Sequence, residues 1–535
     1  MSPRDALRGD LIRVGEMAYF STVPPSVRHA SLVLALLFGC SSEAFVTFNS
    51  DASPAKSEPV VDQDGGGVRE TAPTFCAAGL RSCDQDGRVV ECSADGAAWL
   101  FTETCASGFE CGEGACISLC ESAARDHSFL GCEFFAASVD GYAHTMSVAN
   151  PNLVVPLNAL VTIDALVGGF WTVAAMLEVP PGATLTAGWQ GPTPQAGISL
   201  AAAYRVTATL PVVLYQMQIG GSEGGATLLF PTAALGNDHR GLVAGPGGRL
   251  LILGTVDGTA VTVKPTAEVA AGAALPAIPA GGTWTGTLAA GDALLLTSAG
   301  DLTGSHIESE QPVAVFGTGP GSRGGGADRA EEQLLSIDKW GKRFVAARIV
   351  GSDNPAIESL WRIVAAVDDT TLALTPGAGT AWPAAPATLA AGGFLEVGSA
   401  GHFYIEADQG VLVAQIVAAD LDLVLAPPID NFLDRYFFAN VAGEGSETLT
   451  VIAPAGSTVL LDGVPWTGTW EVAGGDFQVS QAVNPTGSHT LAGAFGATPD
   501  AEPAGLAVLL RSHSGACTFS YMGALRLAPI NATLK

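Results

Sequence analysis

The stretch HIESEQPVAVFG (residues 306–317) decides the fold, because three similar phrases occur elsewhere in the chain. They are YRVTATLPVVLYQ (204–216), FYIEADQGVLVAQ (403–415) and VLLRSHSGACTFS (508–520). Aligning Pro211, Pro312, Gly410 and Gly515 gives intervals of 101, 98 and 105 residues. Each phrase has alternating apolar residues on both sides of a turn-forming residue. This pattern predicts a strand, a tight turn and a second strand with one buried face.

A unit of about 100 residues made of such strands has the size of one two-sheet β-sandwich. We therefore predict an all-β protein with four tandem β-sandwich-like units, preceded by a small disulfide-rich module. The alternative is a β-propeller-like ring, whose blades usually have about 40–50 residues. Closure of the four phrases into one ring would favour that alternative.

The composition agrees with this class and excludes others. The chain has 535 residues, with 66 Gly, 32 Pro and only 14% charged residues, which excludes a long helical protein. A hydrophobic content of 48% argues against a disordered chain. The net charge of -28 repels polyanions, so nucleic acid and acidic membrane surfaces are not expected partners.

The N-terminal part predicts export. SLVLALLFG (31–39) is too short to span a bilayer but suits the apolar part of a signal peptide, which we place at residues 1–39 with Met17 as an alternative start. LFGC (37–40) resembles a bacterial lipobox, so we expect lipidation at Cys40 and a location at the outer membrane or cell surface. The alternative is an ordinary cleaved signal with an incidental Cys. Residues 40–74 are polar and predict a flexible tether.

The cysteines predict a disulfide-stapled module at residues 75–120. Six of them lie within about forty residues that have few large apolar side chains, so three bridges are expected among fifteen pairings (Cys76, Cys83, Cys92, Cys105, Cys111 and Cys116). A zinc site is disfavoured because the segment has no His and no Cys-x-x-Cys. Of the remaining three, either Cys120 or Cys517 could pair with Cys132, which leaves one cysteine over.

Short motifs that are typical of catalytic or cofactor sites occur in the wrong context. GGSEG (220–224) matches the nucleophile elbow, which needs a following helix, whereas ATLLFP predicts a strand. GPGSRG (319–324) matches a dinucleotide-binding loop but lies outside any βαβ pattern. The DQDG sequences at 62–65 and 84–87 lack the later ligands of a calcium loop. We expect no catalytic residue, no metal site and no cofactor.

Other candidate residues are scattered. Adjacent carboxylates at Glu331–Glu332 and Asp368–Asp369 point to opposite faces if they lie on strands, and the first pair also suits the start of a short helix. We expect four tryptophans near loops to be buried, with stacking on sugars as the alternative (Trp361, Trp382, Trp466 and Trp470). The eight histidines form no close pair (29, 127, 144, 239, 306, 402, 489 and 513).

Three phrases carry a resemblance to a known family. LLFPTAALGNDHR (228–240), DLTGSHIESEQPVAVF (301–316) and ADRAEEQLLSIDKWGKRFV (327–345) resemble the N-terminal domain of the IgG Fc-binding protein family, over about residues 144–525. The loop 319–326 lacks the cysteines of the family pattern, and Arg329 stands where the family has a His, so a disulfide or site that depends on them is absent. The resemblance implies an extracellular binding or structural module without catalysis.

Together these features predict a lipid-anchored surface protein for binding or adhesion, with a repeated β region at residues 121–530. Its partner is expected to be an extracellular protein or glycan, and its only membrane contact the lipid anchor. The one binding surface that the sequence suggests is the loop Gly319–Arg329. The competing hypothesis is an extracellular hydrolase of glycan or peptide, which would need acids or a Ser/His pair gathered in one cleft.

Overall fold

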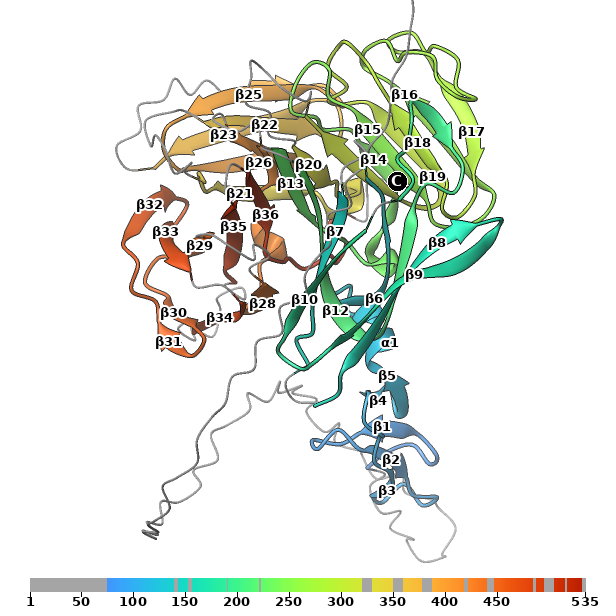
Figure 1. Cartoon of the computed structure of the whole chain (residues 1–535). Coiled ribbons are helices and arrows are strands. Elements are labelled where there is room, and N and C mark those ends of the chain that lie inside the picture. Colours follow the sequence, from blue (N-terminus) through green and yellow to red (C-terminus); the bar gives the residue numbers. More distant parts are fainter. Residues whose placement is uncertain are drawn as a thin grey trace, which may run out of the picture. The chain divides into compact units, whose positions relative to one another are not determined.

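The computed structural model describes residues 75–138, 143–152, 156–189, 191–220, 223–319, 330–349, 359–377, 387–417, 422–439, 447–484, 487–494, 505–514 and 517–531. Cys40 and the residues predicted as signal peptide and tether (1–74) lie outside these residues. Strands make up 58% of the structure and helices 4%, so the all-β prediction is confirmed (Figure 1). None of the helices in the described residues is long and apolar enough to cross a membrane.

The first described residues form the small disulfide-rich module. It contains a three-stranded sheet, β1-β2-β3, and a two-stranded sheet, β4-β5, and it leads into the short helix α1. The bounds are β1 (Arg81–Cys83), β2 (Val89–Cys92), β3 (Trp99–Glu103), β4 (Phe109–Gly112), β5 (Ala115–Ser118) and α1 (Leu119–Arg125). The Ser118 side chain caps α1 by accepting a hydrogen bond from the Glu121 amide.

The remaining described strands form four repeats of one pattern. In repeat 1, the long strand β12 lies between β7 and β8, and the sheet order is β10-β7-β12-β8-β9. Strands β6 and β13 also pair with β12. The bounds are β6 (Gly131–Ala136), β7 (Ala143–Ala149), β8 (Ala159–Val167), β9 (Phe170–Val179), β10 (Thr184–Trp189), β12 (Tyr204–Gly220) and β13 (Glu223–Leu228), while β11 (Gly197–Ser199) pairs with β18 of repeat 2.

Repeats 2 and 3 reproduce the order of repeat 1, as β18-β15-β19-β16-β17 and β25-β22-β26-β23-β24. Repeat 2 comprises the 3-10 helix η1 (Thr232–Ala234), β14 (Gly236–Arg240), β15 (Leu250–Gly254), β16 (Thr259–Lys264), β17 (Trp284–Leu288), β18 (Ala293–Leu296), β19 (His306–Thr318) and β20 (Glu331–Gln333). Repeat 3 comprises η2 (Ile337–Lys339), β21 (Gly341–Ala346), β22 (Ser359–Ala365), β23 (Thr370–Pro376), β24 (Ala387–Leu389), β25 (Phe394–Ser399), β26 (Phe403–Val417) and β27 (Asp422–Leu425).

In repeat 4 the long strand is divided in two. β34 pairs with β28 and β30, as the first half of β12 pairs with β6 and β8, while β35 pairs with β29 and β36. The bounds are η3 (Ile429–Asn431), β28 (Arg435–Ala439), β29 (Glu447–Pro454), β30 (Thr458–Leu461), β31 (Val464–Pro465), β32 (Trp470–Gly474), β33 (Phe477–Asn484), β34 (Ser488–Ala494), β35 (Ala507–Ser514) and β36 (Cys517–Met522).

The turn predicted in the first three phrases is wrong, because a single long strand continues through each of these positions. Pro211, Pro312 and Gly410 lie inside β12, β19 and β26, at places where the pairing register shifts. A proline has no amide hydrogen and interrupts the ladder there, so the strand bends as at a β-bulge rather than reversing. Each long strand thereby exchanges one set of neighbours for another, which allows one strand to serve two curled halves of a repeat.

The fourth phrase is a hairpin, β35–β36, as predicted, but its alignment with the other three is wrong. The hairpin corresponds to the second half of a long strand and the strand after it, as in β12–β13. The bend at Pro211 has its counterpart between β34 and β35, so Gly515 is not equivalent to Pro211.

The four repeats close into a ring. β13 lies beside β20 and β36, and β27 lies beside β20 and β36. At the junction of repeats 4 and 1, the Tyr215 hydroxyl donates a hydrogen bond to the Gly523 carbonyl at 2.8 Å. The β-sandwich-like repeats therefore close into one ring, the arrangement that we gave as favouring the β-propeller-like alternative.

The segment after β36 completes the ring. The amides of Arg526, Leu527 and Ile530 donate to the carbonyls of Asn431, His127 and Asp338, respectively. Asn431 lies in η3, His127 lies between α1 and β6, and Asp338 lies in η2. The side chains of Leu525 and Leu527 are fully buried, so this segment packs against several repeats at once.

Candidate binding surface

The motifs that resemble catalytic signatures form hairpins or lie outside the described residues. GGSEG joins β12 to β13, whose pairing begins at Gly220 and Glu223, and Ser222 is outside the described residues. A strand, rather than a helix, follows this motif, so the requirement for a nucleophile elbow is not met. Of the predicted binding loop, only Gly319 is described, and its amide donates to the Ala330 carbonyl at 3.0 Å.

The histidines lie in separate structural contacts. His144 and His239 are buried, and burial lowers the pKa of each to about 4. His306 is 2.8 Å from Asp238, and His489 is 2.7 Å from Asp462. Within the described residues, no group of three or more His, Cys, Asp or Glu side chains has a geometry suited to a metal ion.

Glu331 and Glu332 begin the strand β20, so their expected place at the start of a helix is wrong, while the expectation of opposite faces is confirmed. Glu331 accepts hydrogen bonds from the side-chain amides of Gln216 and Gln218 in repeat 1. Glu332 accepts from the Leu425 amide of repeat 3 at 3.3 Å. Burial is the main cause that holds the Glu332 pKa well above its usual value; hydrogen bonds from Leu425 and Thr227 oppose this shift, and the nearby carboxylates add to it. The pair links three repeats.

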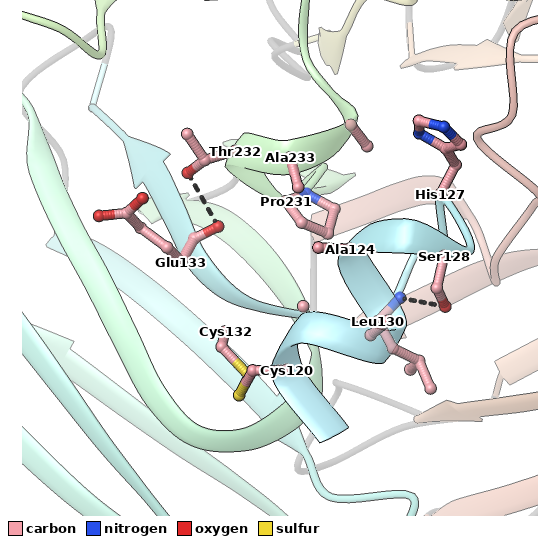
Figure 2. Close-up of a pocket in the computed structure, with 13 residues that line it drawn as sticks. Cys120, Ala124, His127, Ser128, Leu130, Cys132, Glu133, Pro231, Thr232 and Ala233 are labelled. Atoms are coloured by element: carbon pink, nitrogen blue, oxygen red, sulfur yellow. Dashed lines mark hydrogen bonds between the residues drawn. A yellow bond between two sulfur atoms is a disulfide. The ribbon is translucent and has the colours of Figure 1, made fainter. Parts of the chain in front are cut away.

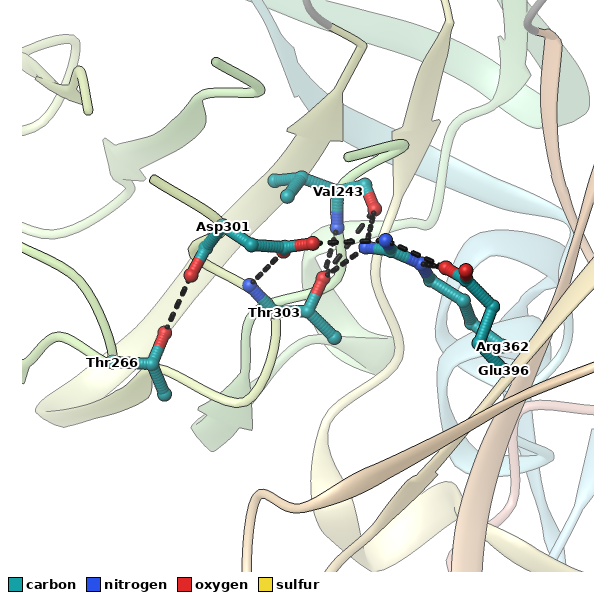
Figure 3. Close-up of polar contacts among 6 residues, drawn as sticks. All are labelled: Val243, Thr266, Asp301, Thr303, Arg362 and Glu396. Atoms are coloured by element: carbon teal, nitrogen blue, oxygen red, sulfur yellow. Dashed lines mark hydrogen bonds and ion pairs between the residues drawn. The ribbon is translucent and has the colours of Figure 1, made fainter. Parts of the chain in front are cut away.

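A second group of charged side chains also has a structural role (Figure 3). The guanidinium of Arg362 on β22 lies 2.8 Å from both Asp301 and Glu396. It also donates to the Val243 carbonyl and to the Thr303 hydroxyl. Arg362 is buried, so its charge is neutralised and its donors are used where repeat 3 meets repeat 2.

Figure 2 shows a cavity of about 150 Å³ between α1, the start of β6 and η1. The Thr232 hydroxyl donates to the Glu133 carbonyl at 3.0 Å on one side, and the Cys120–Cys132 disulfide lies below. The side chains of Glu133 and His127 lie on opposite sides of the cavity, so they do not form an acid–base pair.

Three of the four tryptophans near loops are described. Trp361 is fully buried, and Trp466 and Trp470 are partly buried against the core. Trp382 lies outside the described residues. Trp361 is therefore a core residue, as expected, whereas Trp466 and Trp470 pack against the core and stay partly exposed. Asp368 and Asp369 form the β22–β23 turn, where the Asp368 carboxylate accepts from the Ala391 amide at 2.9 Å.

Eight cysteines form four disulfides: Cys76–Cys92, Cys83–Cys111, Cys105–Cys116 and Cys120–Cys132. The first three staple the module, and the fourth joins α1 to β6. The alternative of a Cys132–Cys517 bridge is therefore wrong, because Cys132 pairs with Cys120. Cys517 begins β36, and its side chain is not among those that the structure describes.

The module exposes the apolar side chains of β3. Trp99, Leu100 and Phe101 are 39%, 55% and 62% exposed, and β3 is an edge strand that pairs only with β2 among the described residues. We call these three residues the β3 face, with Trp99 and Phe101 on one side of the strand and Leu100 on the other. Soluble proteins rarely leave contiguous apolar residues uncovered unless they bind something. Sequence reasoning missed this surface, although three consecutive large apolar residues cannot all point to one side of a strand.

The surroundings of the β3 face are acidic. Residues 75–118 contain two arginines, and both form ion pairs with acids of the module: Arg81 with Glu91, and Arg88 with Asp84 and Asp86. Glu103 at the end of β3 is exposed. In all, the segment has seven acidic residues: Asp84, Asp86, Glu91, Asp95, Glu103, Glu110 and Glu113. An apolar strand with an acidic surround is thus available to a ligand.

Residues 225–499 match the family model described as IgGFc binding protein. The chain belongs to this family. In this IgGFc-binding family member, the match covers β13, repeats 2 and 3 and repeat 4 as far as β34. The disulfide module and most of repeat 1 lie outside the match.

Comparison with other proteins adds little to the family membership. No curated protein matches the chain. A solved structure, the "tetra-tandem repeat in extending region of large adhesion protein", is 13% identical, covers 74% of this chain and 99% of its own, and has a TM-score of 0.10. A similarity this weak does not establish a shared fold.

Proposed function

We propose that this IgGFc-binding family member is an extracellular, non-catalytic binding protein that holds a protein ligand on the β3 face. The observation that carries the proposal is a strand of exposed apolar residues on a module stapled by disulfides. Disulfides limit the freedom of the module, so little ordering free energy is lost when a ligand binds. The ring serves as a scaffold for the module.

The ligand chemistry follows from charge and backbone geometry. Among the described residues no strand pairs with the outer edge of β3, so an extended segment of a partner can add to the sheet by backbone hydrogen bonds, with side-chain contacts to Trp99 and Phe101 on one side and to Leu100 on the other. The acidic surround favours a positively charged segment. We therefore propose a basic, extended segment of an extracellular protein. The β3 face lies outside the family match, so the ligand in the family's name is not transferred to it.

The location is part of the same proposal. Disulfides are typical of exported proteins, which agrees with a signal peptide at residues 1–39 and an acyl anchor on Cys40. The tether at residues 40–74 would hold the module and ring away from the outer membrane. Metabolic palmitate labelling should be lost in Cys40→Ala, and this variant should appear in the medium. Equal labelling of both proteins would contradict the anchor.

Binding can be measured on the full chain with a synthetic probe. A peptide of alternating Lys and Val should bind, and binding should weaken as salt rises above about 0.1 M, where charges more than about 10 Å apart are screened. Trp99→Ser and Phe101→Ser, whose side chains lie on one side of the strand, should each weaken binding by about tenfold or more, because central apolar contacts dominate most interfaces.

The controls separate this surface from non-specific attraction. A peptide of alternating Glu and Val has the same β-propensity pattern but the wrong charge, and it should not bind. Phe170→Ser removes an exposed phenylalanine from repeat 1 and should leave binding unchanged. Equal binding of the two peptides would contradict the proposal, and so would an equal loss of binding in Phe170→Ser and Phe101→Ser. Binding of a neutral glycan to the chain in the absence of any basic peptide would contradict it as well.

A further inference from the structure

A cavity of about 350 Å³ lies where repeat 2 meets repeat 3. Three of its lining residues are basic: Arg240 on β14, His306 on β19 and Lys264 on β16. The other described lining residues are small or polar, and none is acidic (Pro265, Thr266, Gly281, Gly304 and Ala391). We call this cavity the basic pocket.

The pairing register brings the three basic side chains into one row. His306 is the direct partner of Arg240 on one side and of Lys264 on the other. The neighbouring row is buried (His239, Ile307 and Val263), so by alternation the basic row lies on the opposite face of the sheet. Two permanent cations therefore flank one imidazole. Like charges that lie close together across strands destabilise a sheet, and a bound anion would relieve this repulsion.

The ring pattern does not require the basic row, because repeats 1 and 3 have other residues in its place. In repeat 1 the equivalent row contains an ion pair of 3.2 Å between Arg205 and Asp164 (Phe135, Arg205 and Asp164). In repeat 3 the equivalent row has no charge (Val345, Tyr404 and Thr375). Among these three repeats, only repeat 2 places two cations in this row.

Arg240 and Lys264 keep donors for a ligand. The Nε of Arg240 donates to the Ala366 carbonyl at 3.1 Å, and within the described residues its side chain forms no other hydrogen bond and no ion pair. Its Nη1 lies beside Gly392, next to the pocket residue Ala391. Lys264 is exposed and forms no ion pair within the same part of the chain.

The nearest carboxylates are bound to His306 and do not line the basic pocket. Asp238 and Glu308 form the next row on the same face, 2.8 Å and 4.0 Å from the two ring nitrogens of His306. Burial lowers the pKa of Arg240, and these two carboxylates with Asp368 oppose the shift without pairing with it. More distant charges are screened beyond about 10 Å at 0.1 M salt. The net charge of -28 still repels a polyanion, so the pocket suits a ligand with a single negative charge.

We infer that the basic pocket binds the carboxylate of a small acidic sugar. The two terminal nitrogens of Arg240 form a fork that matches the two oxygens of a carboxylate, and the ammonium of Lys264 adds a further donor. A volume of about 350 Å³ is at the small end of ligand sites, which fits one sugar ring. The pocket walls have no large apolar side chain among the described residues, so they suit hydroxyl groups. This site is separate from the β3 face and does not depend on the ligand proposed there.

Calorimetric titration of the full chain with glucuronate tests the inference. Glucuronate should bind with a dissociation constant of about 1 mM, as expected for a ligand of this size, whereas glucose, which has the same ring without the charge, should not bind. Arg240→Gln and Lys264→Gln should each weaken binding by about tenfold, because each removes a charged donor. Lys342→Gln is the matched control, because Lys342 is an exposed lysine on β21, the counterpart of β14 in repeat 3, and it should bind like the wild type.

Further measurements keep the result decisive. If thermal melting shows that Arg240→Gln does not fold, Lys264→Glu replaces it, because it reverses a charge at an exposed position and should abolish binding. No binding of glucuronate at about 10 mM, equal binding of glucose, or unchanged binding in folded Lys264→Gln would overturn the inference. Binding of inorganic sulfate without binding of glucuronate would also overturn it. Because Phe101→Ser leaves the basic pocket unchanged, it should bind glucuronate normally, so failure of the ligand proposal for the β3 face is distinguishable from failure of this site.

Discussion

At the scale of single residues, Glu447 is a buried acid of repeat 4 that binds a tyrosine at the junction with repeat 1. Glu447 begins β29, and its carboxylate accepts hydrogen bonds from Ser512 and Tyr521, both at 2.6 Å. The Tyr521 ring packs edge-on against Tyr215 of repeat 1. Burial raises the pKa of Glu447 to about 7, although the two hydroxyls oppose the shift. The acid therefore binds its proton more tightly in the folded chain than in the unfolded chain.

This difference predicts a pH dependence of stability. Because the folded pKa lies above the unfolded value of 4.5, the contribution is complete below about pH 4.5 and is lost as pH rises through about 7. The free energy of unfolding should fall by about 3 kcal/mol over this range on account of Glu447, and Glu332 acts in the same direction. Denaturant titrations from about pH 4 to 8 should show a smaller fall in Glu447→Gln; an unchanged fall would contradict the assignment.

Arg362 gives a second prediction at this scale. Arg362→Ala leaves Asp301 and Glu396 without their shared cation and the Val243 carbonyl without its donor, so the free energy of unfolding should fall by about 3 kcal/mol. Denaturant unfolding measures this change. The matched control is Arg343→Ala, which removes a half-exposed ion pair with Asp430 and should cost less than about 1 kcal/mol. Similar losses in both variants would contradict a special role for Arg362.

At the scale of elements, small residues in the first strands explain how neighbouring repeats pack. A side chain at Gly131, Gly236 or Gly341 would collide with Pro231, Ser336 or Pro428, respectively. Each of these residues precedes the 3-10 helix of the next repeat. The three glycines recur at intervals of 105 residues, a spacing that gives the repeat in its correct register. Alignment of the four phrases did not give this register, because an amphipathic hairpin and a bent strand have the same alternation of apolar and polar residues.

The segment after β36 is a structural element without regular secondary structure. Leu525→Ala and Leu527→Ala should each lower the free energy of unfolding by about 2–5 kcal/mol, because each leaves a cavity in the core. Leu200→Ala, at a largely exposed leucine, should change it by less than about 0.5 kcal/mol. Denaturant unfolding would separate these cases, and a loss at Leu527 as small as that at Leu200 would refute the packing role.

The module and the ring should respond differently to reductant. The module buries few apolar side chains, chiefly Val89, Val90 and Ile117, so its order depends on its disulfides. After reduction, limited proteolysis with mass spectrometry should show cuts within residues 75–118 while the strands of the ring stay protected. A module that remains resistant would show that its packing suffices without disulfides.

At the scale of the whole molecule, closure between repeats 4 and 1 joins residues hundreds of positions apart, such as Tyr215 and Gly523. The first and last repeats are therefore held together by contacts that no local stretch of sequence can form.

The sequence by itself determined the all-β class, the repetition at about 100 residues, the disulfide-rich module and the resemblance to the family. These properties depend on alternation, turn-forming residues and spacing, which are local along the chain. Only the tertiary structure decided the disulfide partners, the bends in place of turns, the closed ring, the exposure of β3 and the basic pocket. Burial and pairing are set by residues far apart in sequence: WLFTE (99–103) and buried strands look alike as text, and a strand is an edge only if no other strand lies beside it.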